Sequence, residues 1–165
     1  MKYSRCKWVL LLLAAALANS SNADLQNGVP LASDLHSAAD QAEAACMPLL
    51  LEFATDYCEY CVLLEEEVLE PMLLDRDYDQ RVLVRKLVID QAARLRDFAG
   101  HRVSAAQLAE RYRISVTPTL IFVDRHGREL TERMVGVTTL EFYAGYLDRS
   151  LDSASEKLRE RQHCR

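Results

Sequence analysis

Two cysteines separated by two residues are the first feature of this sequence with evident chemistry. Cys58 and Cys61 enclose Glu59 and Tyr60, and they follow a short apolar run over residues 49–54. Such a run predicts a buried strand, and the apolar spacing after it predicts a helix that begins at the cysteines. The unpaired N–H groups and the positive dipole end of that helix would stabilise a thiolate on the first cysteine, with the second in disulfide reach one turn later. The pair therefore predicts thiol–disulfide exchange, with Cys58 attacking and Cys61 resolving the mixed disulfide.

Other uses of a CxxC pair have weaker support in this sequence. A structural disulfide across so short a loop stabilises a fold only a little. A zinc site needs two more ligands at suitable spacing, whereas the four histidines are scattered and no second CxxC exists. A c-type haem requires a histidine directly after the second cysteine, where this sequence has Val62. We therefore expect no metal and no other cofactor.

The elements that must position the cysteines alternate along the chain. Apolar spacing predicts helices over residues 31–45, 58–74 (kinked or ended by Pro71), 104–113, and from Thr138 or Thr139 to at least Leu151. It predicts strands over residues 49–54, 81–90, 119–124 and 130–137, with an irregular stretch over 91–103. Alternating strands and helices favour parallel pairing, and the tight turn at Gly127 favours a final antiparallel hairpin. The fold class is therefore α/β.

The N-terminal residues have the layout of a secretory signal. Three basic residues precede an unbroken apolar run from Trp8 to Ala18, and small residues permit cleavage after Ala18 or Ala23. The run is too short to span a bilayer, which needs about 20 residues, so we expect no stable membrane insertion after cleavage. The predicted division is a signal over 1–23, one domain over 24–152, and a charged tail or helix extension over 153–165.

Composition and cysteine content limit the remaining possibilities. The 165 residues are 50% hydrophobic and 27% charged, which suits one packed domain, and a net charge of −5 argues against a nucleic-acid partner. An exported chain cleaved in this way keeps four of its five cysteines. Cys46 and Cys164 could form a bridge on the side of the domain away from the CxxC pair. Alternatively, Cys46 is a buried free thiol and Cys164 is free or pairs between molecules.

Three segments resemble the thioredoxin family. LLLEFATDYCEYC resembles its active-site segment, RKLVID its next strand with a lysine, and VTPTLIFVDRHGRE the segment that carries its cis-proline; Gly136 matches the glycine that ends its last strand. The resemblance covers residues 45–151 and is nearest to periplasmic thioredoxin-like proteins such as SoxW and the C-terminal domain of DsbD. It implies a thioredoxin fold, with a central mixed β-sheet of about four to five strands flanked by helices in a single domain.

The resemblance assigns roles to matching positions. Pro118 would be the cis-proline that faces the cysteines and aligns the substrate backbone, with Thr117 before it. Glu52 stands where the family has a buried aspartate and would exchange a proton with Cys61; alternatively, its longer side chain reaches solvent. Lys86 would pair with Glu52, or it is a solvated lysine at the strand edge. Substrate contacts are expected from Tyr57, Glu59, Tyr60 and Thr117.

Two departures from the family bear on function. Acidic residues such as Asp56 and Glu59 surround Cys58, and negative neighbours oppose a thiolate, which predicts a reducing disulfide couple. The stretch 91–103 is longer than in cytosolic thioredoxin. It either forms a lip near the active site through Phe98, Gly100 and His101, or it is a surface excursion packed by Leu95 and Phe98.

The leading hypothesis is a periplasmic thiol–disulfide oxidoreductase that reduces disulfides of exported proteins. The resemblance implies electron supply by a membrane thiol donor of the DsbD type, and we expect a monomer. One alternative is an oxidant or isomerase, although the family's isomerases carry a separate dimerisation domain for which this chain has no room. Another is a binding or chaperone module without turnover, against which the intact CxxC pair argues.

Overall fold

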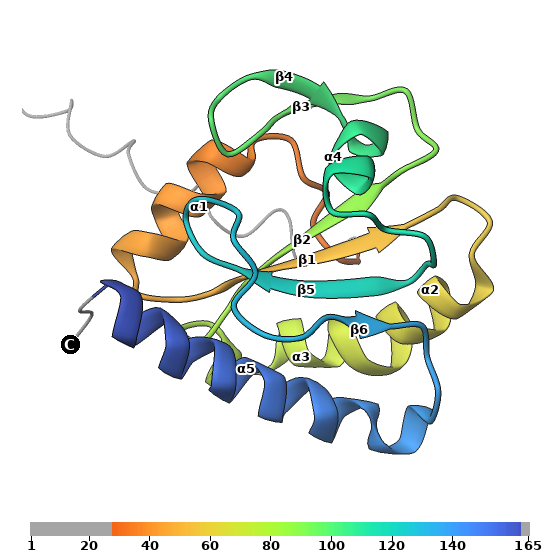
Figure 1. The fold of residues 1–165 in the computed structure, drawn as a ribbon. Coiled ribbons are helices and arrows are strands. Elements are labelled where there is room, and N and C mark those ends of the chain that lie inside the picture. The colour runs from red at the N-terminus through yellow and green to blue at the C-terminus, as the bar shows by residue number, and fades with distance from the viewer. Residues whose placement is uncertain (1–27, 163–165) are drawn as a thin grey trace, which may run out of the picture.

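A computed structural model describes residues 28–162, and the predicted signal lies outside this range. Its centre is a four-stranded sheet in the order β2-β1-β5-β6 (Figure 1). The strands are β1 (Leu49–Ala54), β2 (Leu83–Val88), β5 (Thr119–Val123) and β6 (Met134–Val135). β1 pairs with β2 in parallel and with β5 antiparallel, and β6 is antiparallel to β5. The predicted mixed sheet is confirmed, although the last strand is shorter than the predicted 130–137.

Side chains on alternate sides of β1 build two hydrophobic cores, one on each face of the sheet. Leu50 belongs to the core covered by α2 (Glu59–Leu64), η2 (Glu65–Leu69), α3 (Glu70–Leu74) and α5 (Leu140–Gln162). Leu49, Leu51 and Phe53 belong to the core covered by α1 (Leu35–Ala44), α4 (Ala105–Arg111) and the hairpin of β3 (Arg94–Arg96) and β4 (Arg102–Ser104). Because both faces are covered, every residue of β1 is buried, as its continuous apolar pattern predicts.

The helical stretch after the cysteines continues past Pro71 to Leu74, so the prediction that Pro71 ends it is wrong. The interruption is earlier, where η2 is a π-helical turn in which the Glu70 N–H donates to the Glu65 carbonyl. Pro71 follows directly after this π-helical turn, in the first turn of α3, and has no N–H to donate to the preceding turn. A short 3-10 turn, η3 (Arg76–Tyr78), then leads to β2.

The stretch predicted to be irregular, 91–103, contains β3 and the start of β4. Leu95 and Val103 pair across this hairpin and are buried against the second core. Phe98 packs over the turn at Gly127, where an added Cβ would lie 2.6 Å from the Phe98 ring. This turn follows β5, whose end pairs with the start of β1, so Phe98 lies at the opposite end of the sheet from Cys58. The alternative of a lip formed by Phe98 is therefore wrong, and the surface excursion is confirmed.

The last helix, α5, stays packed on the domain to its end. Ala154 and Leu158 are buried in the first core, and Arg161 donates to the buried carboxylate of Asp124 at 3.1 Å. Burial would raise the pKa of Asp124, but hydrogen bonds from the Arg128 backbone and side chain and the His126 backbone outweigh it and lower that pKa. The tail predicted from residue 153 is thus helical as far as Gln162.

Cys46 lies between α1 and β1, at the end of the sheet opposite the CxxC pair. It lines a polar cleft together with Glu156 and Arg159 of α5, so it is near the last turns of that helix. Cys164 lies outside the described residues, and its pairing with Cys46 stays a prediction.

If the two cysteines pair, peptide mapping of the oxidised, unreduced protein will recover the Cys46 and Cys164 peptides as one linked species. Such a bridge would stabilise the fold by about 3–5 kcal/mol, because it closes a long loop in the unfolded chain. Alkylation of both thiols without reductant would contradict the pairing.

Candidate active site

Cys58 and Cys61 form a disulfide at the start of α2, after the loop that follows β1, at the right-hand edge of Figure 1. Cys58 is the N-cap residue of α2, and its Sγ accepts a hydrogen bond from the Cys61 N–H at 3.1 Å. The Cα atoms of the pair are 5.2 Å apart. An N–H group aimed at Sγ stabilises negative charge on that sulfur once the disulfide is reduced.

The two cysteines differ in accessibility. Cys58 is half-buried, whereas Cys61 is 1% exposed. Around the pair, the side chains of Tyr57 and Tyr60 are 97% and 61% exposed, and that of Glu59 is also exposed. The sulfur of another protein can therefore reach Cys58 but not Cys61. The exposed aromatic side chains of Tyr57 and Tyr60 lie beside this accessible sulfur.

The loop before Cys58 contacts the loop that leads into β5. The Thr117–Pro118 peptide bond is cis, Pro118 is buried, and its carbonyl accepts from the Gly136 N–H at 2.8 Å. The hydroxyls of Thr55 and Thr117 lie 3.4 Å apart. These contacts bring Thr117 and Pro118 to the same end of the sheet as the cysteines.

A second contact holds the same loop, the one before Cys58, from the other neighbouring strand. The backbone N–H of Asp56 donates to both carboxylate oxygens of Asp90 at 3.1 and 3.2 Å, and Gln91 Nε2 donates to the Asp56 carboxylate at 2.6 Å. Asp90 and Gln91 follow β2, which is parallel to β1. The active-site loop is therefore fixed from both neighbouring strands.

Glu52 lies in the middle of β1 with its side chain fully buried. Among the described residues, neither of its carboxylate oxygens has a hydrogen-bond partner. Burial raises the pKa of Glu52 to about 9; the negative charge of Glu65 adds to the rise and Lys86 opposes it. The carboxyl is thus protonated at neutral pH while the cysteines are oxidised, and the alternative that Glu52 reaches solvent is wrong.

Lys86 lies beside Glu52 in the sheet register, but the predicted ion pair between them is wrong. Lys86 Nζ instead donates to Glu65 Oε1 at 2.5 Å. Glu65 projects from the π-helical turn into the space between helix and sheet, where it is almost fully buried. The Lys86 ammonium group therefore forms its ion pair with the Glu65 carboxylate, and the protonated Glu52 has no ion pair with Lys86.

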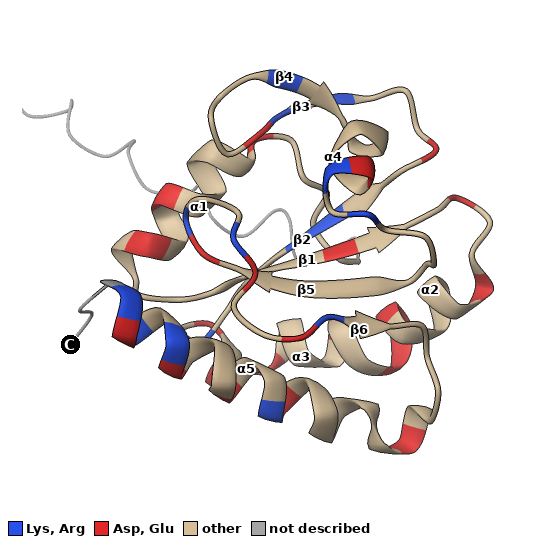
Figure 2. Cartoon of the chain, in the orientation of Figure 1, with Lys and Arg blue, Asp and Glu red and all other residues tan. Residues whose placement is uncertain are grey.

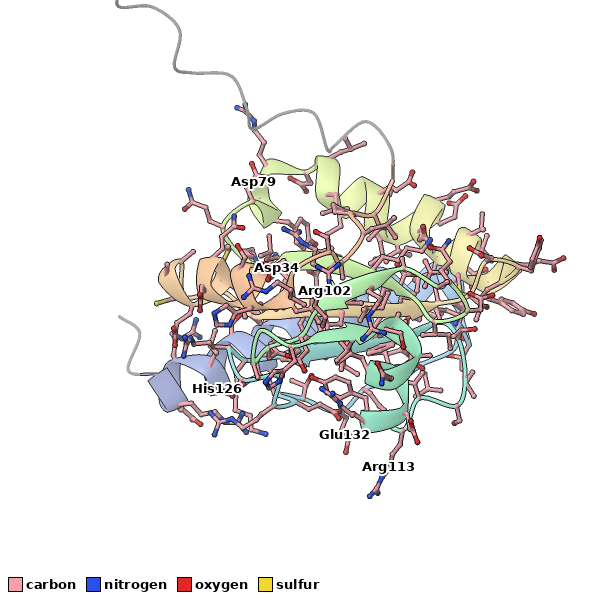
Figure 3. The ribbon with its side chains drawn as sticks, turned by 90° about the horizontal axis from the view of Figure 1, so that it is seen from above. Asp34, Asp79, Arg102, Arg113, His126 and Glu132 are labelled. Carbon is pink, nitrogen blue, oxygen red and sulfur yellow. A yellow bond between two sulfur atoms is a disulfide. The ribbon has the colours of Figure 1, made fainter. Side chains whose placement is uncertain are left out.

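Charge is unevenly distributed over the molecule. From Thr55 to Leu74 the chain has six acidic residues and no basic one. Figure 2 shows acidic residues along α2 to α3 and basic residues on β3 and β4. Seen from above, the labelled Asp79 and Arg113 project from opposite edges (Figure 3). Negative charge therefore gathers along the helical stretch that begins at the cysteines.

Several residues of the site had no distinctive signal in the sequence. Glu65 stands in a run of three glutamates that is equally typical of a solvated helix face, and only its position four residues after Cys61 sets it apart. Thr55 and Asp90 are ordinary residues at strand ends. Within residues 28–162, no group of three or more His, Cys, Asp or Glu side chains is placed to hold a metal ion, and no helix is both long and apolar enough to cross a membrane.

Comparison with known proteins gives a family match and one curated relative. A family model described as a thioredoxin-like domain matches residues 35–150. The thiol:disulfide interchange protein DsbD of Ralstonia nicotianae is 29% identical over 125 residues, which are 76% of this chain and 19% of that protein. The chain thus spans about a fifth of the length of this relative.

Solved structures share the fold at low sequence identity. A DsbH oxidoreductase is 17% identical with a TM-score of 0.53, over 84% of this chain and 94% of that one. The thioredoxin of Fasciola hepatica is 14% identical with a TM-score of 0.50, over 74% of this chain and 96% of that one. The mixed four-stranded sheet flanked by helices is therefore a thioredoxin fold.

Proposed function

The chain belongs to the thioredoxin-like domain family and is a thiol–disulfide oxidoreductase that uses Cys58 and Cys61, and we propose that it reduces disulfides of exported proteins. The observation that carries this proposal is the difference between the two sulfurs. Cys58 is accessible and receives the Cys61 N–H, whereas Cys61 is buried. The first sulfur is suited to attack a foreign disulfide and the second to an intramolecular step.

The reaction runs in two exchanges. The reduced Cys58 thiolate attacks one sulfur of the substrate disulfide, and the other substrate sulfur leaves as a thiolate that takes a proton from water. Cys61 then loses its proton and attacks Cys58 Sγ. The Cys58–Cys61 disulfide forms, the second substrate sulfur leaves as a thiolate that takes a proton from water, and two electrons have passed to the substrate.

Glu52 is the group proposed to take and return the Cys61 proton. Its carboxylate accepts the proton as Cys61 attacks, which yields the protonated carboxyl expected from a pKa of about 9 in the oxidised protein. When a donor thiolate later attacks Cys58, Cys61 leaves as a thiolate and takes that proton back. Pro118 and Thr117 would align the substrate backbone beside the exposed Tyr57, Glu59 and Tyr60.

The reducing direction is supported by the charges around the cysteines. The exposed Asp56 and Glu59 flank Cys58, and the helical stretch that follows has no basic residue before Arg76. Negative charge opposes the Cys58 thiolate, and a less stable thiolate gives a more stable disulfide and a lower reduction potential. The N–H of Cys61 acts in the opposite sense but is a partial charge.

The proposed location is the periplasm, with a membrane thiol donor of the DsbD type supplying electrons. The basic N-terminus and the apolar run up to Ala18 support export. Similarity to one part of a thiol:disulfide interchange protein supports a place in a chain of thiol–disulfide exchanges. The substrates would be exported proteins with oxidised cysteines.

The reduction potential of the Cys58–Cys61 couple tests the direction. Equilibration with a thiol buffer of known potential should place it nearer to about −270 mV, as for thioredoxin, than to about −120 mV, as for a strong oxidant. Glu59→Lys should raise the potential by roughly 10–30 mV, because it replaces a negative neighbour by a positive one. Glu132→Lys, an exposed change in the loop between β5 and β6, is the matched control. A wild-type potential near that of the oxidant would favour an oxidant or isomerase.

A further inference from the structure

Three buried side-chain oxygens have no hydrogen-bond partner among the described residues. They are both carboxylate oxygens of Glu52 and the hydroxyl of Tyr143, a residue of α5 that is 3% exposed. A buried polar atom without a partner is costly, and most such atoms in folded proteins are satisfied by protein or ordered water. That these three belong to only two residues calls for a common explanation.

Glu52 and Tyr143 face the same core. Side chains alternate along β1, so Glu52 points to the same face as Leu50, and its antiparallel neighbour in β5 is Leu120. Leu50, Leu120 and Tyr143 all belong to the hydrophobic core beneath α5. The carboxyl and the hydroxyl therefore project into one apolar layer from opposite sides, sheet and helix.

Besides Tyr143, the group of this layer that acts most strongly on the Glu52 carboxyl is Glu65 of η2, which is close enough to raise the pKa of Glu52. From β2, Lys86 is engaged by Glu65 of η2, and β5 contributes the apolar Leu120. Cys61 of α2 is disulfide-bonded and does not titrate in this state. Burial raises the pKa of Tyr143, and the negative charge of Glu52 raises it further, which is the expected effect of two groups close enough to interact.

We propose that a buried water bridges the Tyr143 hydroxyl and the Glu52 carboxyl, and that Tyr143 is thereby a positioning residue for proton transfer in the CxxC reaction. The two side chains give such a water the two or more polar partners that a buried water needs. As the phenol donates to the water and the water to the carboxylate, the bridge stabilises ionised Glu52. The catalytic consequence rests on the proposed role of Glu52, whereas the bridge itself does not.

The bridge makes the titration of Glu52 depend on one hydroxyl. Tyr143→Phe keeps the ring in the core but removes the donor, so ionised Glu52 loses a partner. We expect the Glu52 midpoint to rise by about 0.5–1 pH unit. Tyr146→Phe is the matched control, because Tyr146 lies on the same helix with its side chain exposed.

The experiment follows the Glu52 carboxyl in the oxidised protein, by the infrared band of the protonated acid or by NMR of isotope-labelled glutamate, with Glu52→Gln to assign the signal. A higher midpoint in Tyr143→Phe and an unchanged one in Tyr146→Phe would support the bridge. Equal midpoints in wild type and Tyr143→Phe would overturn it. Because no turnover is involved, this outcome is independent of whether the protein reduces substrates.

Thermal unfolding gives a second readout. If the hydroxyl is bridged, Tyr143→Phe removes a satisfied hydrogen bond and lowers Tm. If the hydroxyl has no partner, the same change removes an unsatisfied group, and an unchanged or higher Tm would contradict the proposal. Since tyrosine and phenylalanine have nearly the same shape, the variant is expected to fold.

Discussion

Replacing Cys58 by serine will reduce the insulin-reduction rate, measured with dithiothreitol as electron source, to that of dithiothreitol alone. A hydroxyl is not ionised at neutral pH and is a far weaker nucleophile toward sulfur, so we expect a loss of at least about a hundredfold. Cys61 cannot substitute, because it is buried behind Cys58. Precipitation of reduced insulin is the measurement.

The matched variant is Cys61→Ser, which keeps the attacking sulfur and removes the resolving one. It should accumulate a mixed disulfide on Cys58, detectable as a mass increase that dithiothreitol reverses, and it offers a way to capture substrates. Cys46→Ser changes a cysteine at the other end of the sheet and should leave the rate unchanged. Wild-type turnover by Cys58→Ser would remove the assignment of the nucleophile.

Replacing Glu52 by glutamine will change how the stability of the oxidised protein depends on pH. Burial raises the pKa of Glu52 from 4.5 to about 9, so between these values the folded state holds a proton that the unfolded state has lost. The free energy of unfolding of the wild type therefore falls as pH rises through this window, by up to about 1.4 kcal/mol per pH unit from this group. Glutamine does not titrate and removes this contribution.

The quantity to measure is the difference in free energy of unfolding between Glu52→Gln and wild type, by urea denaturation from pH 5 to pH 9. It should shift in favour of the variant by several kcal/mol across the window. Glu67→Gln changes an exposed glutamate of η2 and should give a difference that is nearly flat with pH. Parallel curves for Glu52→Gln and wild type would mean that Glu52 is ionised in the folded protein.

Local patterns were sufficient for the catalytic pair and for the order of the main elements. The apolar run of β1, the cysteines that begin a helix, and the Ser104 cap of α4 are set by neighbouring residues, and the structure has each of them. The mixed sheet followed from alternating elements and one tight turn, because chain connectivity restricts how such strands pair. The hairpin of β3 and β4 was not predicted, because each of its strands has only three residues. The hairpin depends instead on the packing of Leu95 and Val103 in the second core.

The sequence by itself determined the CxxC pair and its scaffold and was sufficient to predict which cysteine attacks and which resolves, since these depend on spacings of a few residues along one strand and one helix. Only the tertiary structure decided the proton chemistry beneath them. Lys86 pairs with Glu65, 21 residues away, and not with its sheet neighbour Glu52. Glu52 is left buried and protonated opposite Tyr143 of the last helix. Such partners are selected by distance, charge and solvent exclusion among side chains that come from separate elements, and these quantities exist only once the chain has folded.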